Sequence, residues 1–277
     1  MGVLNVTPDS FSDGGRYLDP DRALARARQM RDEGADLLDV GGESTRPGAP
    51  PVDEEEEKRR VLPVLERLAA ADLGLPISLD TNKASVARAG AAAGASLIND
   101  VSAGTLDPEM LSTVAALGLP ICLMHLPVRP GEMGWSRTVM GEAQDEASFV
   151  AAVAEFLRAR VVAAREAGIA EDQIVLDPGF GFGKSVAQNL TLLRRLPDLR
   201  ARVGGGGLPL LMGTSRKSTI GRVLGEKADR ADPDRVAGTA ATVALSIASG
   251  VDIVRVHDVG FMVRVARMAD AVMGRGG

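Results

Sequence analysis

The chain has 277 residues, of which 45% are hydrophobic and 25% are charged, and its formal net charge is −5. This composition is that of a globular protein and excludes a disordered or fibrous chain. The acidic balance and the aromatic content of 3% argue against a generic nucleic-acid-binding protein. The single cysteine, Cys122, excludes a disulfide framework and a cysteine-rich zinc site.

Eight short apolar runs predict strands. They cover residues 2–6, 36–40, 76–80, 96–100, 120–125, 174–177, 208–213 and 252–257. Each run is continuously apolar, which is typical of strands buried on both faces of a parallel sheet. Amphipathic, helix-like stretches separate the runs. Eight strand–helix units in this order, without a linker, predict an α/β fold, a single (β/α)8 TIM barrel domain over residues 1–277. An open doubly wound sheet is the alternative.

Three other segments carry specific signals. Residues 53–57 are five consecutive carboxylates, which suit the positive end of a helix dipole and predict a solvated first turn. Ser185 and Gln188 have the spacing of a capping box. The uncharged run 236–251 contains Gly, Thr and Ser and is shorter than the ~18 residues of a membrane span, so it predicts a buried helix. No targeting segment is visible, so we expect a cytoplasmic protein.

Polar residues follow the predicted strands. They are Asn5, Glu43 to Arg46, Asp80, Asn99, Asp100, His125, Asp177, Ser215 to Lys217, Arg255 and His257. In a parallel barrel the carboxyl ends of the strands form the active site. One such residue means little, because Asp and Asn often cap the next helix, and for Asp100 we prefer that interpretation. The whole set predicts a catalytic rim.

The charges on this rim divide into two chemistries. One group is cationic and suits a phosphorylated or diphosphorylated substrate; it consists of Arg46, Lys184, Lys217, Arg255 and His257. The other group, Asp80, Asn99 and Asp177, suits a flat heterocycle, because a carboxylate accepts two N–H bonds and an Asn amide both donates and accepts. The sequence therefore predicts a barrel enzyme that binds a polar heterocycle and handles phosphate.

Seven motifs occur in order along the chain. They are NVTPDSFSDGG (5–15), DVGGESTRPG (39–48), SLDT (78–81), INDVSAG (98–104), DPGFGFGK (177–184), GTSRKS (213–218) and RVHDV (255–259). Together they resemble the dihydropteroate synthase family, and the resemblance runs over nearly the whole chain. It implies a TIM barrel enzyme that joins 4-aminobenzoate to 6-hydroxymethyl-7,8-dihydropterin diphosphate, with Mg²⁺ as cofactor, and gives 7,8-dihydropteroate and diphosphate.

The resemblance also implies roles for single residues. The pterin ring is expected to contact Asp80, Asn99, Met124, Asp177 and Lys217, and Arg255 to lie on its face and toward the diphosphate. Asn5, as the metal ligand, and His257 match the diphosphate and Mg²⁺ end. The 4-aminobenzoate pocket is expected to contain Pro47, Phe182, Ser215 and Lys217. Thr45, Arg46 and Pro47 match a loop that closes over the reacting centre. Catalysis is expected to depend on Asp80, Asp177, Lys217 and Arg255.

These roles imply an SN1-like substitution in which the arylamine traps a pterin-stabilised cation, without a protein nucleophile. Three alternatives stay open. One is a pterin-binding barrel of the methyltetrahydrofolate:corrinoid methyltransferase type, which has no need of the phosphate-facing residues. The second is an inactive pterin-binding paralogue, and the third is a generic phosphate-binding barrel isomerase. The small residues of 236–248 also permit close helix approach, and the resemblance implies a homodimer through this region or its neighbours.

Overall fold

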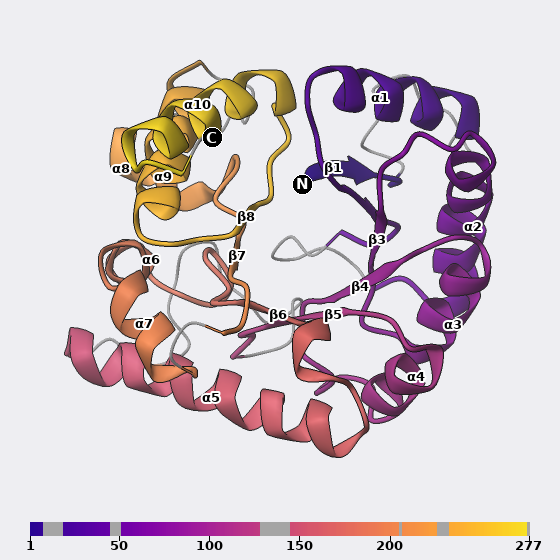
Figure 1. Cartoon of the computed structure of the whole chain (residues 1–277), viewed down its shortest axis with the longest axis horizontal. Coiled ribbons are helices and arrows are strands. Elements are labelled where there is room, and N and C mark those ends of the chain that lie inside the picture. Colours follow the sequence, from indigo (N-terminus) through magenta and orange to yellow (C-terminus); the bar gives the residue numbers. More distant parts are fainter. Residues whose placement is uncertain (8–18, 45–50, 128–144, 205–206, 226–232, 276–277) are drawn as a thin grey trace.

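The computed structural model describes residues 1–7, 19–44, 51–127, 145–204, 207–225 and 233–275. Eight strands lie at the centre of the molecule and helices surround them (Figure 1). The strands are β1 (Gly2–Asn5), β2 (Leu38–Gly41), β3 (Ile77–Asp80), β4 (Leu97–Asp100), β5 (Ile121–Met124), β6 (Ile174–Asp177), β7 (Leu211–Met212) and β8 (Ile253–Val254). All eight predicted strands are confirmed, seven of them within their apolar runs and β2 extending one residue beyond its run, to Gly41.

The strands pair in parallel with their neighbours in the sequence. Strands β1 to β6 form one sheet in the order β1-β2-β3-β4-β5-β6, and β7 pairs with β8 in a second sheet. Isolated parallel bridges join the two sheets at both seams, Leu176 with Leu210 and Gly2 with Val256. The ring of a (β/α)8 barrel is thereby completed, and the doubly wound alternative is wrong.

The helices pack around the outside of this ring (Figure 1). They are α1 (Pro20–Asp32), α2 (Glu54–Ala70), α3 (Ala84–Ala92), α4 (Met110–Leu117), α5 (Glu146–Glu166), α6 (Val186–Arg194), α7 (Leu196–Arg202), α8 (Ser218–Leu224), α9 (Pro233–Ala248) and α10 (Val259–Val272). The short 3-10 helix η2 (Glu171–Gln173) precedes β6. No helix in the described ranges combines the length and the apolar character needed to cross a bilayer.

Local sequence explains where two of these helices begin. Asp53 caps α2 through a bond from the backbone N–H of Glu56, and the capping box of Ser185 and Gln188 opens α6 as predicted. The prediction of a solvated first turn in α2 is wrong at Glu57, whose side chain is fully buried. The predicted buried helix, α9, buries one face only, since Leu245 on it is 58% exposed.

Candidate active site

The strand register sets three predicted site residues at one level of the barrel. Asn5 lies opposite Gly41, Gly41 opposite Asp80, and Asp80 opposite Asn99. A Cβ on Gly41 would lie 3.3 Å from the Cβ of Asp80, so the glycine leaves room for that carboxylate. The carboxyl ends of β1, β3 and β4 therefore bring Asn5, Asp80 and Asn99 to the same rim.

Arg255, which follows β8, connects this level to a carboxylate deeper in the barrel. Its Nη2 donates to Asp80 Oδ2 at 2.9 Å, and its Nε donates to Asp39 Oδ2 at 2.6 Å. Asp39 is fully buried in β2 and also accepts from Asn99 Nδ2 at 3.2 Å. One network thus fixes the guanidinium, the Asn99 amide and the Asp80 carboxylate.

In this network the carboxylates of Asp39 and Asp80 both contact the single guanidinium of Arg255. Burial raises the pKa of Asp80 to about 7; Arg255 opposes the rise and the negative charge of Asp39 adds to it. The two carboxylates raise the pKa of Arg255 further above its ordinary value, against the effect of its burial. The rim therefore carries surplus acceptor capacity, which suits a ligand edge rich in N–H donors.

Asp177 at the end of β6 forms the second acidic group of the site. It is buried, and its Oδ1 accepts from the backbone N–H of Gly179 at 2.7 Å. Burial raises the pKa of the Asp177 carboxyl, while Lys217, Lys184 and Arg255 act in the opposite direction. Across the register from Asp177 lies Met124, a buried side chain beside Phe182 in a small apolar cluster.

The next part of the site begins at Phe182 of this cluster and includes Lys217, Ser215 and His257. Lys217 Nζ lies 3.8 Å from the centre of the Phe182 ring, a cation–π contact. Ser215 Oγ accepts from the backbone N–H of His257 at 3.2 Å and lies 3.0 Å from His257 Nδ1. Lys217 thus brings a positive charge both to the Phe182 ring and to the neighbourhood of Asp177, a combination that suits a charged aromatic ligand.

The prediction that Lys184 joins the phosphate-facing cations is wrong. Its side chain is fully buried, and Nζ donates to the backbone carbonyls of Gly179, Phe182 and His125 at 2.8, 3.1 and 3.3 Å. Burial lowers the pKa of Lys184 to about 7, and Asp177 opposes the shift. The prediction that Asp100 caps the next helix is wrong, because α4 begins at Met110 with Glu109 before it; the Asp100 carboxylate instead accepts from Ser102 and Gly104 in the turn after β4.

Two features escaped the sequence reasoning. Asp39 lies within a predicted buried strand, where a carboxylate is rare unless it is paired. Its position in the sequence could therefore have indicated that it has a charged partner. The second feature is a charged cluster of Glu43, which follows β2, Lys83, which follows β3, and Glu57 in α2. Lys83 Nζ donates to Glu57 Oε2 at 2.5 Å and also to Glu43. No spacing in the sequence joins these three residues.

Thr45, Arg46 and Pro47 lie outside the described residues.

As to metal binding, Asn5 offers one amide oxygen, and the described ranges contain no group of three His, Cys, Asp or Glu side chains that could hold a metal ion. Mg²⁺ at phosphate sites is commonly held by one or two protein ligands together with water and substrate phosphates. Asn5 fits Mg²⁺ as a single ligand of an ion that is otherwise coordinated by a diphosphate.

Comparison with known proteins agrees with this geometry. Residues 1–257 match the pterin binding enzyme family. The chain is 48% identical over 277 residues to the dihydropteroate synthase of Bacillus subtilis, covering 100% of this chain and 89% of that protein. It is 45% identical over 273 residues to the dihydropteroate synthase of Synechocystis, covering 98% and 89%.

A solved structure of Xanthomonas albilineans dihydropteroate synthase with 4-aminobenzoic acid superposes with a TM-score of 0.85 at 46% identity, covering 98% of this chain and 92% of that one. The family match extends over most of the chain, and the relatives are aligned over nearly their whole length. The eight-stranded barrel with its acidic and cationic rim thus belongs to a member of the pterin binding enzyme family.

Proposed function

We propose that the chain is a dihydropteroate synthase that condenses 6-hydroxymethyl-7,8-dihydropterin diphosphate with 4-aminobenzoate, giving 7,8-dihydropteroate and diphosphate. The observation that carries the proposal is the juxtaposition at one barrel rim of buried acceptors and a cationic aromatic wall. The acceptors are Asp80, Asn99 and Asp177, and the wall is formed by Phe182 and Lys217.

The pterin is held by the acidic side of the rim. The carboxylates of Asp177 and Asp80 accept from N–H groups at the edge of the ring, and the Asn99 amide, oriented by Asp39, adds a directional contact. Met124 packs against the ring, and Arg255 covers its face. Two ion pairs restrain the Arg255 guanidinium before the substrate binds, so little reorganisation is needed on binding.

The 4-aminobenzoate lies against the other side of the rim. Phe182 stacks on the benzoate ring, while Lys217 and Ser215 bind the carboxylate or the reacting edge of the pterin. Thr45, Arg46 and Pro47 are assigned to this end of the pocket from the motif alone. The amine nitrogen then faces the CH₂ carbon of the bound pterin.

The reaction begins with heterolysis of the bond between the CH₂ carbon and the diphosphate oxygen, and the electron pair leaves with the diphosphate. The cation that remains is delocalised over the pterin and stabilised by the charges of Asp80 and Asp177. Arg255 and His257 balance the charge on the departing diphosphate. Asn5 would hold Mg²⁺ at this end of the site, and the ion would supply further charge stabilisation. The amine lone pair forms the new C–N bond, and the nitrogen gives up one proton to the departing diphosphate.

Steady-state assays test this proposal. Wild type should release diphosphate and form dihydropteroate, and EDTA should abolish the reaction. Lys217→Ala should lose most of the activity, whereas Lys58→Ala, which removes only a surface ion pair with Glu55, should retain it. Pterin binding by folded wild type without turnover would refute the synthase function and favour an inactive paralogue.

The cleavage step has its own test. Dihydropterin diphosphate labelled with ¹⁸O in the bridging position should scramble the label on the enzyme if the C–O bond breaks before the amine attacks. Label that stays in place during turnover, or a covalent enzyme adduct, would contradict the dissociative pathway.

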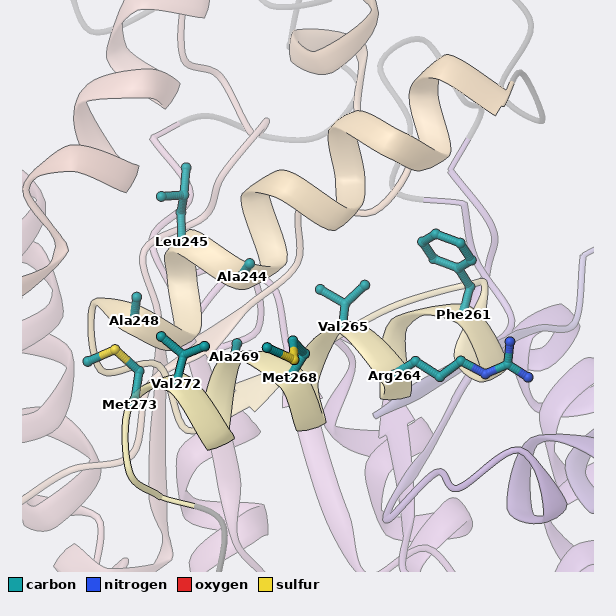
Figure 2. Close-up of a pocket in the computed structure, with 10 residues that line it drawn as sticks. All are labelled: Ala244, Leu245, Ala248, Phe261, Arg264, Val265, Met268, Ala269, Val272 and Met273. Atoms are coloured by element: carbon teal, nitrogen blue, oxygen red, sulfur yellow. The ribbon is translucent and has the colours of Figure 1, made fainter.

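The second part of the proposal is that the chain forms a homodimer through α9 and α10. An apolar groove runs between these helices (Figure 2), and its lining residues are Ala244, Leu245, Ala248, Phe261, Arg264, Val265, Met268, Ala269, Val272 and Met273. Met268 and Val272 in it are 65% and 70% exposed. An exposed apolar patch of this kind marks an interaction surface, and a second copy of the same groove is a self-complementary partner.

Light scattering tests the assembly. Wild type should have the mass of a dimer at micromolar concentration, and Met268→Glu should shift it to a monomer. The matched control is Val162→Glu on α5, which also places a carboxylate at an exposed apolar position but away from the groove. A monomeric wild type, or a dimer unaffected by Met268→Glu, would refute this arrangement.

A further inference from the structure

Lys184 is a buried cation that the reaction outlined above does not use. It lies at the end of the loop between β6 and α6, directly before the helix cap Ser185, and its side chain is fully buried. All three hydrogen bonds of its ammonium go to backbone carbonyl oxygens. An ammonium has three donors, so these carbonyls satisfy it and offset the cost of removing it from water.

The three carbonyls come from two different loops. Gly179 and Phe182 belong to the loop after β6, whereas His125 follows β5. Gly179 has a φ of +71°, and a Cβ there would lie 2.1 Å from the His125 carbonyl oxygen and 3.0 Å from Lys184 Nζ. The backbone therefore folds tightly around the ammonium, in a conformation that only glycine allows at this point.

The same loop carries the aromatic wall of the site. Phe182 donates its backbone N–H to the Gly179 carbonyl at 3.1 Å and gives its own carbonyl to Lys184. Its ring is the one that faces the Lys217 ammonium. Asp177, in contrast, is a strand residue whose carbonyl accepts from the His125 backbone N–H at 2.9 Å, a contact independent of Lys184.

We propose that Lys184 is a positioning residue that holds the Phe182 wall in place for 4-aminobenzoate by drawing three loop carbonyls onto one ammonium. This inference rests on the proposed function, because it assigns Phe182 to the 4-aminobenzoate pocket. The loss of Lys184 should affect the second substrate more than the first, since Asp80 and Asn99 are held by the sheet and by the Asp39 network, and Asp177 stays anchored in β6 although its Oδ1 also accepts from Gly179 of the same loop. A residue needed only for folding would lower the active fraction without changing either substrate affinity.

The test compares Lys184→Met and Lys184→Arg with wild type. Methionine keeps much of the length and removes every donor, so the KM for 4-aminobenzoate should rise roughly tenfold or more, the effect expected from losing charge-assisted hydrogen bonds. The dissociation constant of dihydropterin diphosphate, measured by calorimetry without 4-aminobenzoate, should stay within about threefold of wild type. Arginine keeps the charge, but its planar guanidinium cannot direct three donors from a single nitrogen to these three carbonyls, so its KM should lie between the two.

The control is Arg160→Met, which removes a cation from the backbone carbonyl of Ala103, a 2.7 Å contact of the β4–α4 turn, and should leave the KM for 4-aminobenzoate unchanged. An unchanged KM in folded Lys184→Met overturns the inference, as does an equal rise in both substrate constants. If Lys184→Met does not fold, a wild-type KM in Lys184→Arg overturns it. An inactive wild type would instead refute the proposed function.

Discussion

Asp39→Asn is the substitution that most sharply probes how the site is organised. Asp39 is fully buried, contacts Arg255 Nε at 2.6 Å and Asn99 Nδ2 at 3.2 Å, and has no assigned contact with substrate. Asparagine retains the size of the side chain and one acceptor oxygen but removes the charge. The guanidinium then has a full negative charge only from Asp80, and the amide nitrogen that replaces one carboxylate oxygen is a donor, so it cannot accept from Asn99 Nδ2 as Oδ1 of Asp39 does at 3.4 Å.

The expected loss follows from the hydrogen bonds involved. A hydrogen bond to a charged group contributes about 1.5–3 kcal/mol and a neutral one about 0.5–1.5 kcal/mol, so the substitution should remove roughly 1–2 kcal/mol of orientation energy. Such a loss corresponds to a fall of about 5- to 30-fold in kcat/KM for dihydropterin diphosphate. Because Asp39 adds to the raised pKa of Asp80, the pKa of Asp80 should also fall in the variant.

The assay is steady-state diphosphate release with the pterin substrate varied, combined with urea denaturation to establish that the variant is folded. Asp252→Asn is the matched control, because Asp252 also accepts from an arginine, Arg200 at 2.8 Å, but lies before β8 at the opposite end of the barrel. A folded Asp39→Asn enzyme with kcat/KM within twofold of wild type would refute the positioning argument.

Three further predictions concern the neighbouring groups. Since burial raises the pKa of Asp80 from 3.8 to about 7, the affinity for dihydropterin diphosphate should fall as pH is lowered through 7, and a flat calorimetric profile would contradict this. Because of the same shift, the protonated Asp80 carboxyl adds to the free energy of unfolding. This contribution is complete below pH 3.8 and is lost as the pH rises through about 7. Lys83→Met leaves the buried Glu57 without its cation and should cost about 3–5 kcal/mol in urea denaturation. Adding Glu57→Gln should recover part of that loss, and an unchanged midpoint in the single variant would show that the pair is not coupled. Phe182→Leu removes the cation–π contact and should raise the KM for 4-aminobenzoate about 2- to 30-fold, with no change counting against the stacking role.

The barrel and most of its rim could be predicted from the sequence because both follow from local patterns. Continuous apolar runs identify buried parallel strands, and in a (β/α)8 fold every strand ends at the same rim. Asp80, Asn99 and Asp177 therefore lie at the same rim, with Asp80 and Asn99 side by side, although they are far apart in the chain. The capping box before α6 could be predicted for the same reason, since its two residues are three positions apart.

Lys184 and Glu57 could not be predicted because their environments depend on tertiary packing. Both are charged residues in segments that look exposed, yet the fold buries them against loop carbonyls and against Lys83, respectively. Asp39 could have been identified as paired from its position in a buried strand, but its partner Arg255 is separated from it by most of the chain. Sequence patterns indicate that a buried charge needs a partner without indicating which residue supplies it.

The proposed function requires that the active site at this barrel rim catalyse the condensation of a dihydropterin with an arylamine. The most direct measurement is mass-spectrometric identification of the product after incubating the purified chain with dihydropterin diphosphate, 4-aminobenzoate and Mg²⁺, with diphosphate quantified in the same samples. We expect 7,8-dihydropteroate and diphosphate in equal amounts. Diphosphate with hydroxymethyl-dihydropterin in place of dihydropteroate, or no product from a folded protein that binds the pterin, would contradict it.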